Sequence, residues 1–110
     1  MPFDLIYHDE EPTRESIDQT HGLLLLEFGA SWCAHCQSLS PTVEALLRER
    51  PEVQHVRIAD GRGKRLGRSF RVKLWPTLVF LRDGEVIAQL ARPSSDETRQ
   101  GFEQLLQNST

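Results

Sequence analysis

The sequence predicts an α/β fold in which one mixed β-sheet of about five strands is flanked by about four helices. Short apolar runs alternate with segments of helical periodicity, which is typical of strands joined by helical crossovers. The dipeptide Asp83-Gly84 separates the last two apolar runs and is a strong hairpin signal, so these two strands should pair antiparallel. A chain of 110 residues can bury one ordinary hydrophobic core, so residues 1–110 are expected to form a single domain.

The first half of the chain is expected to contain three strands and two helices. Residues 3–8 alternate loosely and predict a first strand, and residues 12 to about 20 predict a weak helix that begins at a proline. Residues 23–29 carry apolar side chains for both faces of a sheet, which indicates a central strand. Apolar residues recur at helical spacing from residue 33 to about residue 50, and residues 54–59 alternate as a third strand does.

The alternation in residues 54–59 also predicts which side chains face the core. Val56 and Ile58 are expected to point inward, and His55 and Arg57 are expected to point outward.

The second half of the chain is expected to contain two helices and a hairpin. A basic segment that ends near Arg71 is expected to be helical, because Leu66 and Phe70 are spaced four apart. Residues 77–81 and 85–91 are the two strands of the hairpin. A capping box, Ser94-x-x-Glu97, begins a last amphipathic helix. Its apolar face is formed by Phe102, Leu105 and Leu106.

Composition narrows the class of protein. The chain is 38% hydrophobic and 26% charged, as soluble globular proteins are. Its first residues lack the basic start and the apolar stretch of a signal peptide, and its longest apolar run is far too short for a membrane span. We therefore expect a cytoplasmic protein that is not bound to a membrane.

Charge is unevenly distributed along the chain. Residues 61–82 carry seven basic side chains and no acidic one, whereas the first twenty residues are strongly acidic. The basic stretch could attract an acidic partner or nucleic acid, or it could be a solvated helix face partly paired with the acidic N-terminus. No aromatic residues suited to base stacking are interleaved with it, so the solvated face is favoured and no nucleic-acid partner is expected.

The two cysteines of the chain, Cys33 and Cys36, stand two residues apart in Trp32-Cys33-Ala34-His35-Cys36. Such a pair fits a redox dithiol, half of a zinc site or coincidence. Here it follows an apolar strand and precedes a helical segment, which is the arrangement that dithiol chemistry needs. The free N–H groups and the dipole at the helix N-terminus would stabilise a thiolate at Cys33, and Cys36 would be close enough to attack a mixed disulfide.

Zinc binding is the main rival to the redox interpretation. A structural zinc site needs two further ligands at usable spacing. No two of the four histidines stand close together in the sequence, and only His35, which lies between the cysteines, is near a cysteine. We therefore expect no metal. The histidines concerned are His8, His21, His35 and His55.

Taken together, these features resemble the thioredoxin family over nearly the whole chain. The forty residues from Cys36 to Pro76 resemble the family's interval between its dithiol and its cis-proline. The resemblance implies a thioredoxin fold. It is carried by Glu27-Phe28, Trp32-Cys33-x-x-Cys36, Pro41, the Asp60-Gly61 region, Trp75-Pro76-Thr77 and Phe80-x-x-Asp83-Gly84-Glu85.

The resemblance implies roles for matching positions. Cys33 resembles the exposed attacking cysteine and Cys36 the buried resolving one, and their disulfide would be the redox group in place of a cofactor. Pro76 resembles the cis-proline opposite the dithiol, so we expect a cis peptide bond between Trp75 and Pro76, within van der Waals reach of the two sulfurs. The backbone before that proline would pair with an extended substrate. Thr77 follows it, as in much of the family.

Glu27 occupies the place of the family's buried acid beneath the second cysteine. There a carboxylate could take the proton of Cys36, directly or through water, and burial is expected to raise its pKa. The alternative is a glutamate that reaches solvent at the end of its strand.

Several departures concern the neighbours of the dithiol, which are Trp32, Ala34 and His35. Ala34-His35 stands where thioredoxins usually carry Gly-Pro and is more similar to protein disulfide isomerase. A protonated His35 would make the disulfide more oxidising, unless its side chain simply faces solvent. Trp75 is expected to form a bulky wall beside the sulfurs, the alternative being a core tryptophan. Arg92 stands in the turn that lines the family's docking surface.

The resemblance therefore implies a monomeric thiol–disulfide oxidoreductase. Its expected partners are proteins that contain disulfides and an electron donor of the thioredoxin-reductase type. One alternative is a non-catalytic interaction or chaperone-like module with a regulatory dithiol. A weaker alternative, suggested by Ala34-His35, is an oxidase or isomerase in an oxidising compartment.

Overall fold

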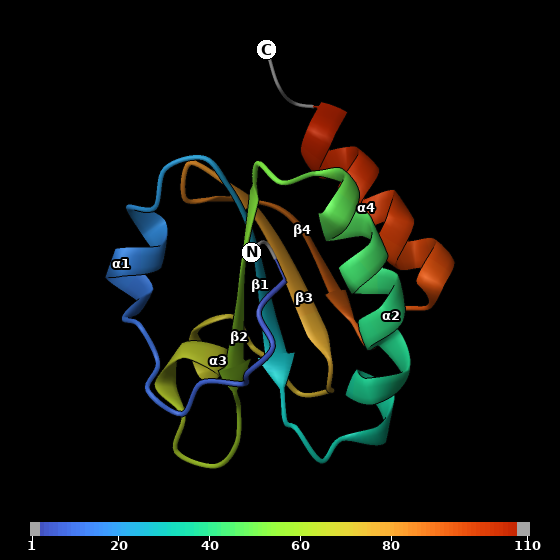
Figure 1. Ribbon diagram of the computed structural model, residues 1–110. Helices are drawn as coiled ribbons and strands as arrows, with labels where there is room; N and C mark the ends of the chain where they lie inside the picture. Colours follow the sequence, from blue (N-terminus) through green and yellow to red (C-terminus); the bar gives the residue numbers. More distant parts are fainter. Residues whose placement is uncertain (1–2, 108–110) are drawn as a thin grey trace.

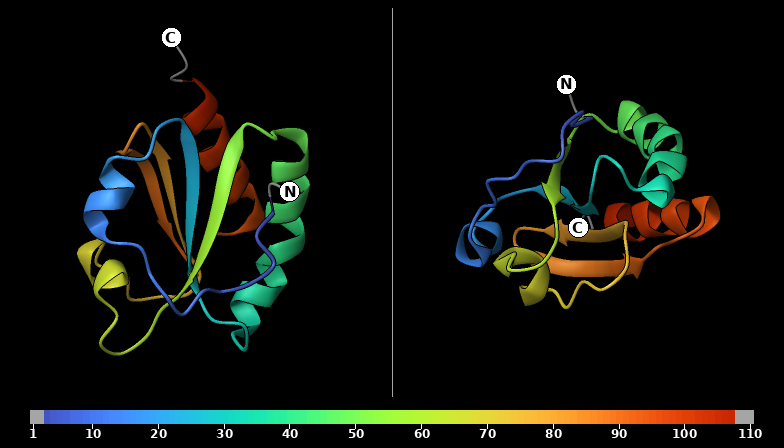
Figure 2. Two further views of the ribbon diagram at one scale, coloured as in Figure 1. Left: turned by 60° about the vertical axis from the view of Figure 1, so that its left-hand side comes forward. Right: turned by 90° about the horizontal axis from the view of Figure 1, so that it is seen from below.

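The computed structural model describes residues 3–107, and in it the chain folds into a mixed sheet with helices on both faces (Figure 1). Helices α1 and α3 cover one face and α2 and α4 the other, as the additional views show (Figure 2). The predicted order of elements is confirmed from the first helix onward. The elements are α1 (Arg14–Asp18), β1 (Leu23–Gly29), α2 (Ala34–Glu49), β2 (Val53–Ala59), α3 (Arg65–Ser69), β3 (Thr77–Arg82), β4 (Glu85–Ala91) and α4 (Ser95–Gln107).

The strands lie in the order β2-β1-β3-β4, so β1 is a central strand as its two apolar faces predict. Strands β1 and β2 are parallel and are joined by α2, whereas β3 pairs antiparallel with both β1 and β4. At the β3–β4 hairpin, Asp83 and Gly84 have φ angles of 49° and 81°. Positive φ at both positions is what a type I′ turn requires, and it accounts for the hairpin signal.

The prediction of a first strand over residues 3–8 is wrong, so the sheet formed by residues 3–107 has four strands instead of about five. The segment does run alongside β2, but only His8 forms a bridge, with Ile58. The carboxylate of Asp4 accepts hydrogen bonds from the backbone N–H groups of Ile6 and Arg57. Side-chain hydrogen bonds thus replace part of the ladder that a strand would form.

Two hydrophobic clusters fill the spaces between the sheet and its helices. One lies under α1 and α3 and the other under α2 and α4, so the sheet is buried on both faces. The first cluster includes Ile17, Leu24, Leu26, Phe28, Ile58, Leu66, Phe70, Val79 and Leu81. The second includes Leu25, Leu39, Val43, Leu47, Val53, Leu78, Phe80, Phe102 and Leu105.

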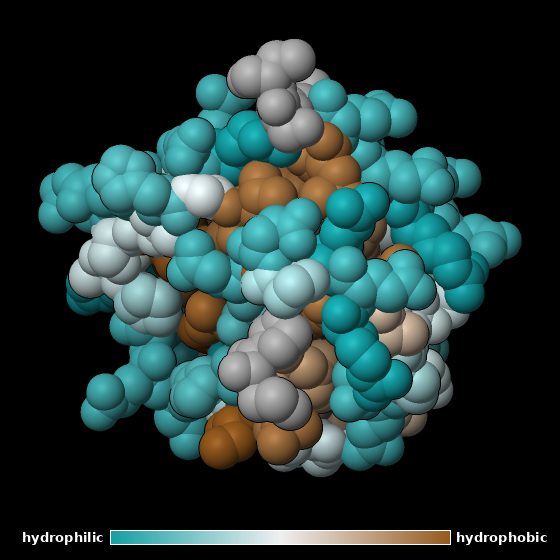
Figure 3. Space-filling view, turned by 45° about the horizontal axis from the view of Figure 1, so that its top comes forward, coloured by the Kyte–Doolittle hydropathy of each residue, from teal (hydrophilic) through white to brown (hydrophobic). Residues whose placement is uncertain are grey.

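The capping box at the start of α4 is confirmed. The N–H of Ser94 donates to the carboxylate of Glu97 at 2.8 Å, and the N–H of Glu97 donates to Ser94 Oγ at 3.1 Å. The face drawn in Figure 3 is largely hydrophilic, with apolar side chains visible between the polar ones. No helix within residues 3–107 combines the length and the apolar character needed to cross a bilayer.

Candidate active site

The two cysteines lie at the start of α2, just beyond the end of β1. Cys33 is the N-cap of α2, and its Sγ accepts a hydrogen bond from the N–H of Cys36 at 3.3 Å. Both cysteines are free thiols. Cys33 is 7% exposed and Cys36 is 1% exposed, so Cys33 is the more accessible sulfur, as expected, although most of it is covered. The cap position places Cys33 Sγ at the positive end of the helix dipole.

The thiol of Cys36 is difficult to ionise in this setting. Burial, together with its hydrogen bond to Cys33, raises the pKa of Cys36 to about 11, although hydrogen bonds from the Ala30 backbone and from Tyr7 act in the opposite direction. At neutral pH Cys36 is therefore a neutral thiol. Because only the thiolate is a good nucleophile, an attack by Cys36 needs a group that takes its proton.

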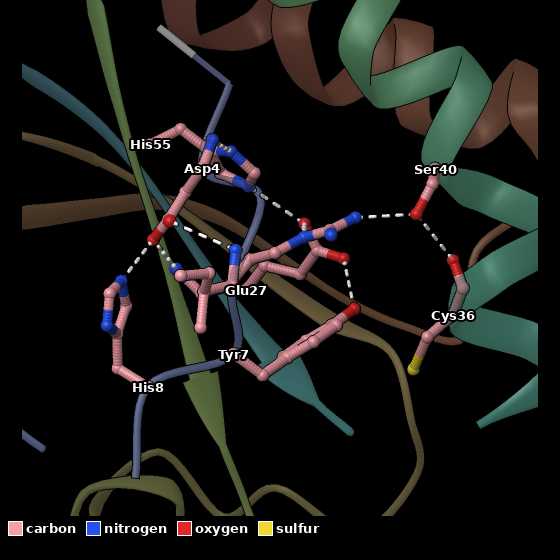
Figure 4. A network of polar contacts seen from close by, with 9 residues as sticks. Asp4, Tyr7, His8, Glu27, Cys36, Ser40 and His55 are labelled. Atoms are coloured by element: carbon pink, nitrogen blue, oxygen red, sulfur yellow. Dashed lines mark hydrogen bonds and ion pairs between the residues drawn. The ribbon is translucent and has the colours of Figure 1, made fainter. Parts of the chain in front are cut away.

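The carboxylate of Glu27 lies completely buried at the centre of a polar network (Figure 4). Its Oε2 accepts a hydrogen bond from the Tyr7 hydroxyl at 2.9 Å. Its Oε1 accepts hydrogen bonds from His55 Nε2 at 2.8 Å and from Arg57 Nε at 3.2 Å. The alternative of a glutamate that reaches solvent is therefore wrong.

The expected direction of the Glu27 pKa shift is also wrong. Burial alone would raise the pKa of Glu27, but the hydrogen bond from His55 and the charge of Arg57 outweigh it and hold the pKa below its usual value. Arg57 is a charge partner of Glu27. The orientation of His55 is set by the Asp4 N–H, which donates to His55 Nδ1 at 2.9 Å. With Nδ1 as an acceptor, Nε2 is the ring nitrogen that donates to Glu27.

The prediction that His55 and Arg57 point outward is wrong. They are 8% and 5% exposed. Glu27 is the parallel partner of Arg57 in the β1–β2 register, so their side chains share one face of the sheet. Alternate side chains of β2 therefore lie on two buried faces, one apolar and one polar, rather than on a buried face and an exposed face. The Arg57 guanidinium also lies 4.6 Å from the ring centre of Phe3 and 4.7 Å from that of Tyr7.

Arg57 and Ser40 connect the network to the dithiol helix. Arg57 Nη2 donates to Ser40 Oγ at 2.6 Å, and Ser40 Oγ donates to the Cys36 carbonyl at 3.0 Å (Figure 4). Sequence reasoning missed Tyr7, Ser40, His55 and Arg57 as members of the site. One signal was available, because a glutamate in the middle of an apolar central strand requires buried donors, and a neighbouring strand carried His55-x-Arg57.

Trp75 and Pro76 form another wall of the site. The expected cis peptide bond between them is confirmed. Trp75 packs against the cluster of Ala30, Cys33 and Cys36, its Nε1 donates to Asp60 at 3.0 Å, and its ring lies edge-on to exposed Trp32 at 5.4 Å. These contacts place Trp75 beside the dithiol.

Arg92 contacts the backbone around Pro76. Its N–H donates to the Pro76 carbonyl at 2.7 Å, and its Nε donates to the Trp75 carbonyl at 2.9 Å. Its φ of 48° lies in the left-handed region that favours glycine. Arg92, Pro76 and exposed His35 help to line a hollow of about 200 Å³.

Two other predicted site residues differ in their surroundings. Ala34 is exposed in the first turn of α2. Thr77 is 1% exposed, and its hydroxyl donates to the Leu74 carbonyl at 2.6 Å, so its side chain holds the chain before Pro76 rather than facing the hollow. Within residues 3–107 no group of three or more His, Cys, Asp or Glu side chains is placed to hold a metal ion.

Comparison with known proteins agrees with this geometry. The thioredoxin family model matches residues 5–107. The chain belongs to the thioredoxin family. It is 46% identical to a solved thioredoxin 2 from Pseudomonas aeruginosa PAO1 in its reduced form, with a TM-score of 0.81 over 94% of this chain and 96% of that one. Members of this family are protein disulfide oxidoreductases that act through a dithiol, and this chain has the paired cysteines of that activity.

More distant relatives include a thioredoxin H-type from Ricinus communis, 27% identical over 84% of this chain and 81% of that protein. A thioredoxin from Chlamydia trachomatis is 35% identical over 60% of this chain and 65% of that protein. Protein disulfide isomerase-like 1-4 from Arabidopsis thaliana is 42% identical over 56% of this chain, which matches 11% of that longer protein.

Proposed function

We propose that the chain reduces or exchanges protein disulfides through a Cys33-Ala34-His35-Cys36 active site. The Cys33 thiolate attacks a substrate disulfide, forms a mixed disulfide and releases the first substrate thiolate. Cys36 then attacks Cys33 Sγ, which closes the Cys33–Cys36 disulfide and releases the second thiolate. The substrate gains two electrons and the dithiol loses two, so no further cofactor is needed for the exchange.

The observation that carries this proposal is the contrast between the two sulfurs. Cys33 caps a helix and is 7% exposed, whereas Cys36 is 1% exposed and lies in a cluster against which Tyr7, a donor to the Glu27 carboxylate, packs. The environment of Cys33 favours a thiolate that attacks the substrate. The environment of Cys36 favours a protonated thiol until the mixed disulfide has formed.

The outer wall of the site supports a docking role for the chain around the cis-proline. Trp75, Pro76 and Arg92 would contact an extended substrate, and His35 would stabilise the Cys33 thiolate from the hollow beside them. We further propose that the protein is a monomer in a reducing cytoplasm. It would receive electrons from a donor of the thioredoxin-reductase type and pass them to disulfide-containing proteins.

An insulin reduction assay tests the function. Wild type should catalyse turnover with dithiothreitol as electron donor. Cys33→Ser should abolish it, and Cys36→Ser should accumulate the mixed disulfide. Inactive wild type would favour the alternative of a non-catalytic interaction module with a regulatory dithiol.

A further inference from the structure

The structure places the hydroxyl of Tyr7 beside both the Cys36 thiol and the Glu27 carboxylate. The Tyr7 hydroxyl donates to Glu27 Oε2 at 2.9 Å, and the Tyr7 side chain packs against the cluster that contains Cys33 and Cys36. In Figure 4 the hydroxyl lies between the Glu27 carboxylate and the Cys36 sulfur. Cys36 is 1% exposed, whereas Tyr7 is only partly buried, so the sulfur has little contact with bulk water and its proton needs an acceptor inside the protein.

Gly29 leaves the space in which the Tyr7 ring and the Cys36 sulfur come close together. A Cβ at residue 29 would lie 2.5 Å from Cys36 Sγ, 3.2 Å from Tyr7 Cε1 and 3.4 Å from Tyr7 Oη. The sulfur and the phenol therefore converge on the space that the missing side chain leaves. The nearby Tyr7 hydroxyl lowers the pKa of Cys36 against the effect of burial.

We infer that the Tyr7 hydroxyl passes the proton of Cys36 to Glu27 when Cys36 resolves the mixed disulfide, an inference that rests on the function proposed above. Glu27 Oε1 already accepts from His55 and Arg57, whereas Oε2 accepts from Tyr7. The carboxylate oxygen that faces the thiol is thus reached through the phenol.

The step balances without any other reactant. The S–H proton of Cys36 moves to Tyr7 Oη while the hydroxyl proton of Tyr7 moves to Glu27 Oε2. Cys36 becomes a thiolate, Glu27 becomes a neutral acid and Tyr7 remains a phenol. The thiolate attacks Cys33 Sγ and breaks the bond from Cys33 to the substrate sulfur. The departing substrate thiolate takes up one proton and Glu27 releases one, so the net transfer is from Cys36 to the substrate.

The surroundings of Tyr7 favour this concerted transfer over a separate tyrosinate. Burial and the negative charge of Glu27 raise the pKa of Tyr7, although Arg57 acts in the opposite direction. A tyrosinate would therefore be costly, and the phenol can pass a proton only by giving up its own at the same time. The ionisable groups around it are Glu27 on β1, Arg57 and His55 on β2, and Cys33 and Cys36 at the start of α2.

The test uses 5,5′-dithiobis(2-nitrobenzoate) as a model disulfide, followed by stopped-flow absorbance. The first nitrothiobenzoate is released when Cys33 attacks, and the second when Cys36 resolves the mixed disulfide. Tyr7→Phe removes only the hydroxyl. We expect the first rate constant to change less than about twofold, and the second to fall roughly 100-fold, the lower end of the range for loss of general acid–base catalysis.

A matched control is Thr42→Val, which removes a hydroxyl that hydrogen-bonds to Ser95 Oγ at 2.9 Å between α2 and α4. It should leave both rate constants unchanged although it also removes a partly buried hydrogen bond. An unchanged second rate constant in Tyr7→Phe would overturn the relay, and so would an equal loss in Thr42→Val. If wild type releases no nitrothiobenzoate at all, the proposed function fails instead.

A second measurement does not depend on the folding of a variant. In mixtures of H₂O and D₂O, the second rate constant of wild type should show a curved dependence on the deuterium fraction, because two protons move in one step. A linear dependence, as for a single proton, would overturn the relay. Where Tyr7→Phe folds, its smaller solvent isotope effect on the same step separates proton transfer from a purely structural contribution of the phenol.

Discussion

Replacing Arg57 by methionine tests whether this side chain neutralises the buried Glu27 carboxylate. The two groups are 3.2 Å apart, and their side chains are 6% and 0% exposed. Removing one partner of a buried ion pair costs about 3–5 kcal/mol, because the other charge stays buried without compensation. Against a total stability of about 5–15 kcal/mol, this is a large fraction. We expect the melting temperature at neutral pH to fall by roughly 15–30 °C.

The dependence on pH makes the prediction specific. In wild type the pKa of Glu27 is lowered in the folded state, so its contribution to stability is fully present above the unfolded pKa and is lost as the pH falls through the folded pKa. In Arg57→Met burial remains but the cation is gone, so the folded pKa should rise above the unfolded value of about 4.3. The variant should then lose stability as the pH rises through its new folded pKa.

The assay is urea unfolding of both proteins from about pH 4.5 to pH 8, with the difference in free energy of unfolding plotted against pH. The deficit of Arg57→Met should be large at neutral pH and should shrink toward the acid end. Arg48→Met is a suitable control, because Arg48 is 75% exposed in its pair with Glu44 and should contribute at most about 1 kcal/mol. A deficit that stays constant over this range, or one no larger than that of Arg48→Met, would refute the assignment.

Three further predictions concern the sulfurs and the docking wall. Arg92→Gly removes a left-handed arginine and frees the Trp75 carbonyl for a substrate backbone, so KM for a protein disulfide should fall while kcat holds. An unchanged KM would count against docking at the Trp75 carbonyl, and a raised KM would show that the Arg92 side chain itself binds substrate. Exchange of Ala34-His35 for Gly-Pro should lower the reduction potential, measured against glutathione, by tens of millivolts from a wild-type value of roughly −250 to −190 mV. An unchanged potential would show that His35 does not affect the dithiol. Gly29→Ala places a Cβ 2.5 Å from the resolving sulfur, so thermal unfolding should show a loss of about 1–3 kcal/mol, and unaltered stability would contradict the close packing described here.

Local signals predicted the fold well. The strand from Leu23 to Gly29, the Asp83-Gly84 hairpin and the capping box at Ser94 each depend on neighbours a few residues away, and the structure confirms all three. The strand predicted at residues 3–8 does not form, because this segment makes hydrogen bonds to residues far away in the sequence. The hydrogen bonds of Asp4 reach Arg57 and His55 on β2, about fifty residues further along the chain.

The candidate site was predicted only in part for the same reason. The dithiol and the cis bond before Pro76 could be inferred from motifs, because their residues are adjacent or belong to the family resemblance. The direction of the Glu27 pKa shift could not be inferred from the sequence. Burial raises this pKa and the donors of β2 lower it, and the balance depends on the distances between these groups in the folded chain. Alternation in β2 predicted two faces correctly but not that both are covered. What covers the polar face is the helix α2 and the N-terminal segment.

The absence of a strand at residues 3–8 also affects the polar network around Glu27. Because Asp4 holds its backbone by side-chain hydrogen bonds, the segment can turn the Asp4 N–H toward His55 Nδ1 and the Tyr7 hydroxyl toward Glu27. The first contact makes His55 a donor to the carboxylate, and the second joins that carboxylate to a phenol that packs against the cluster of the two cysteines. A segment that looks like an edge strand in the sequence thus supplies two of the contacts on which the resolving step would depend.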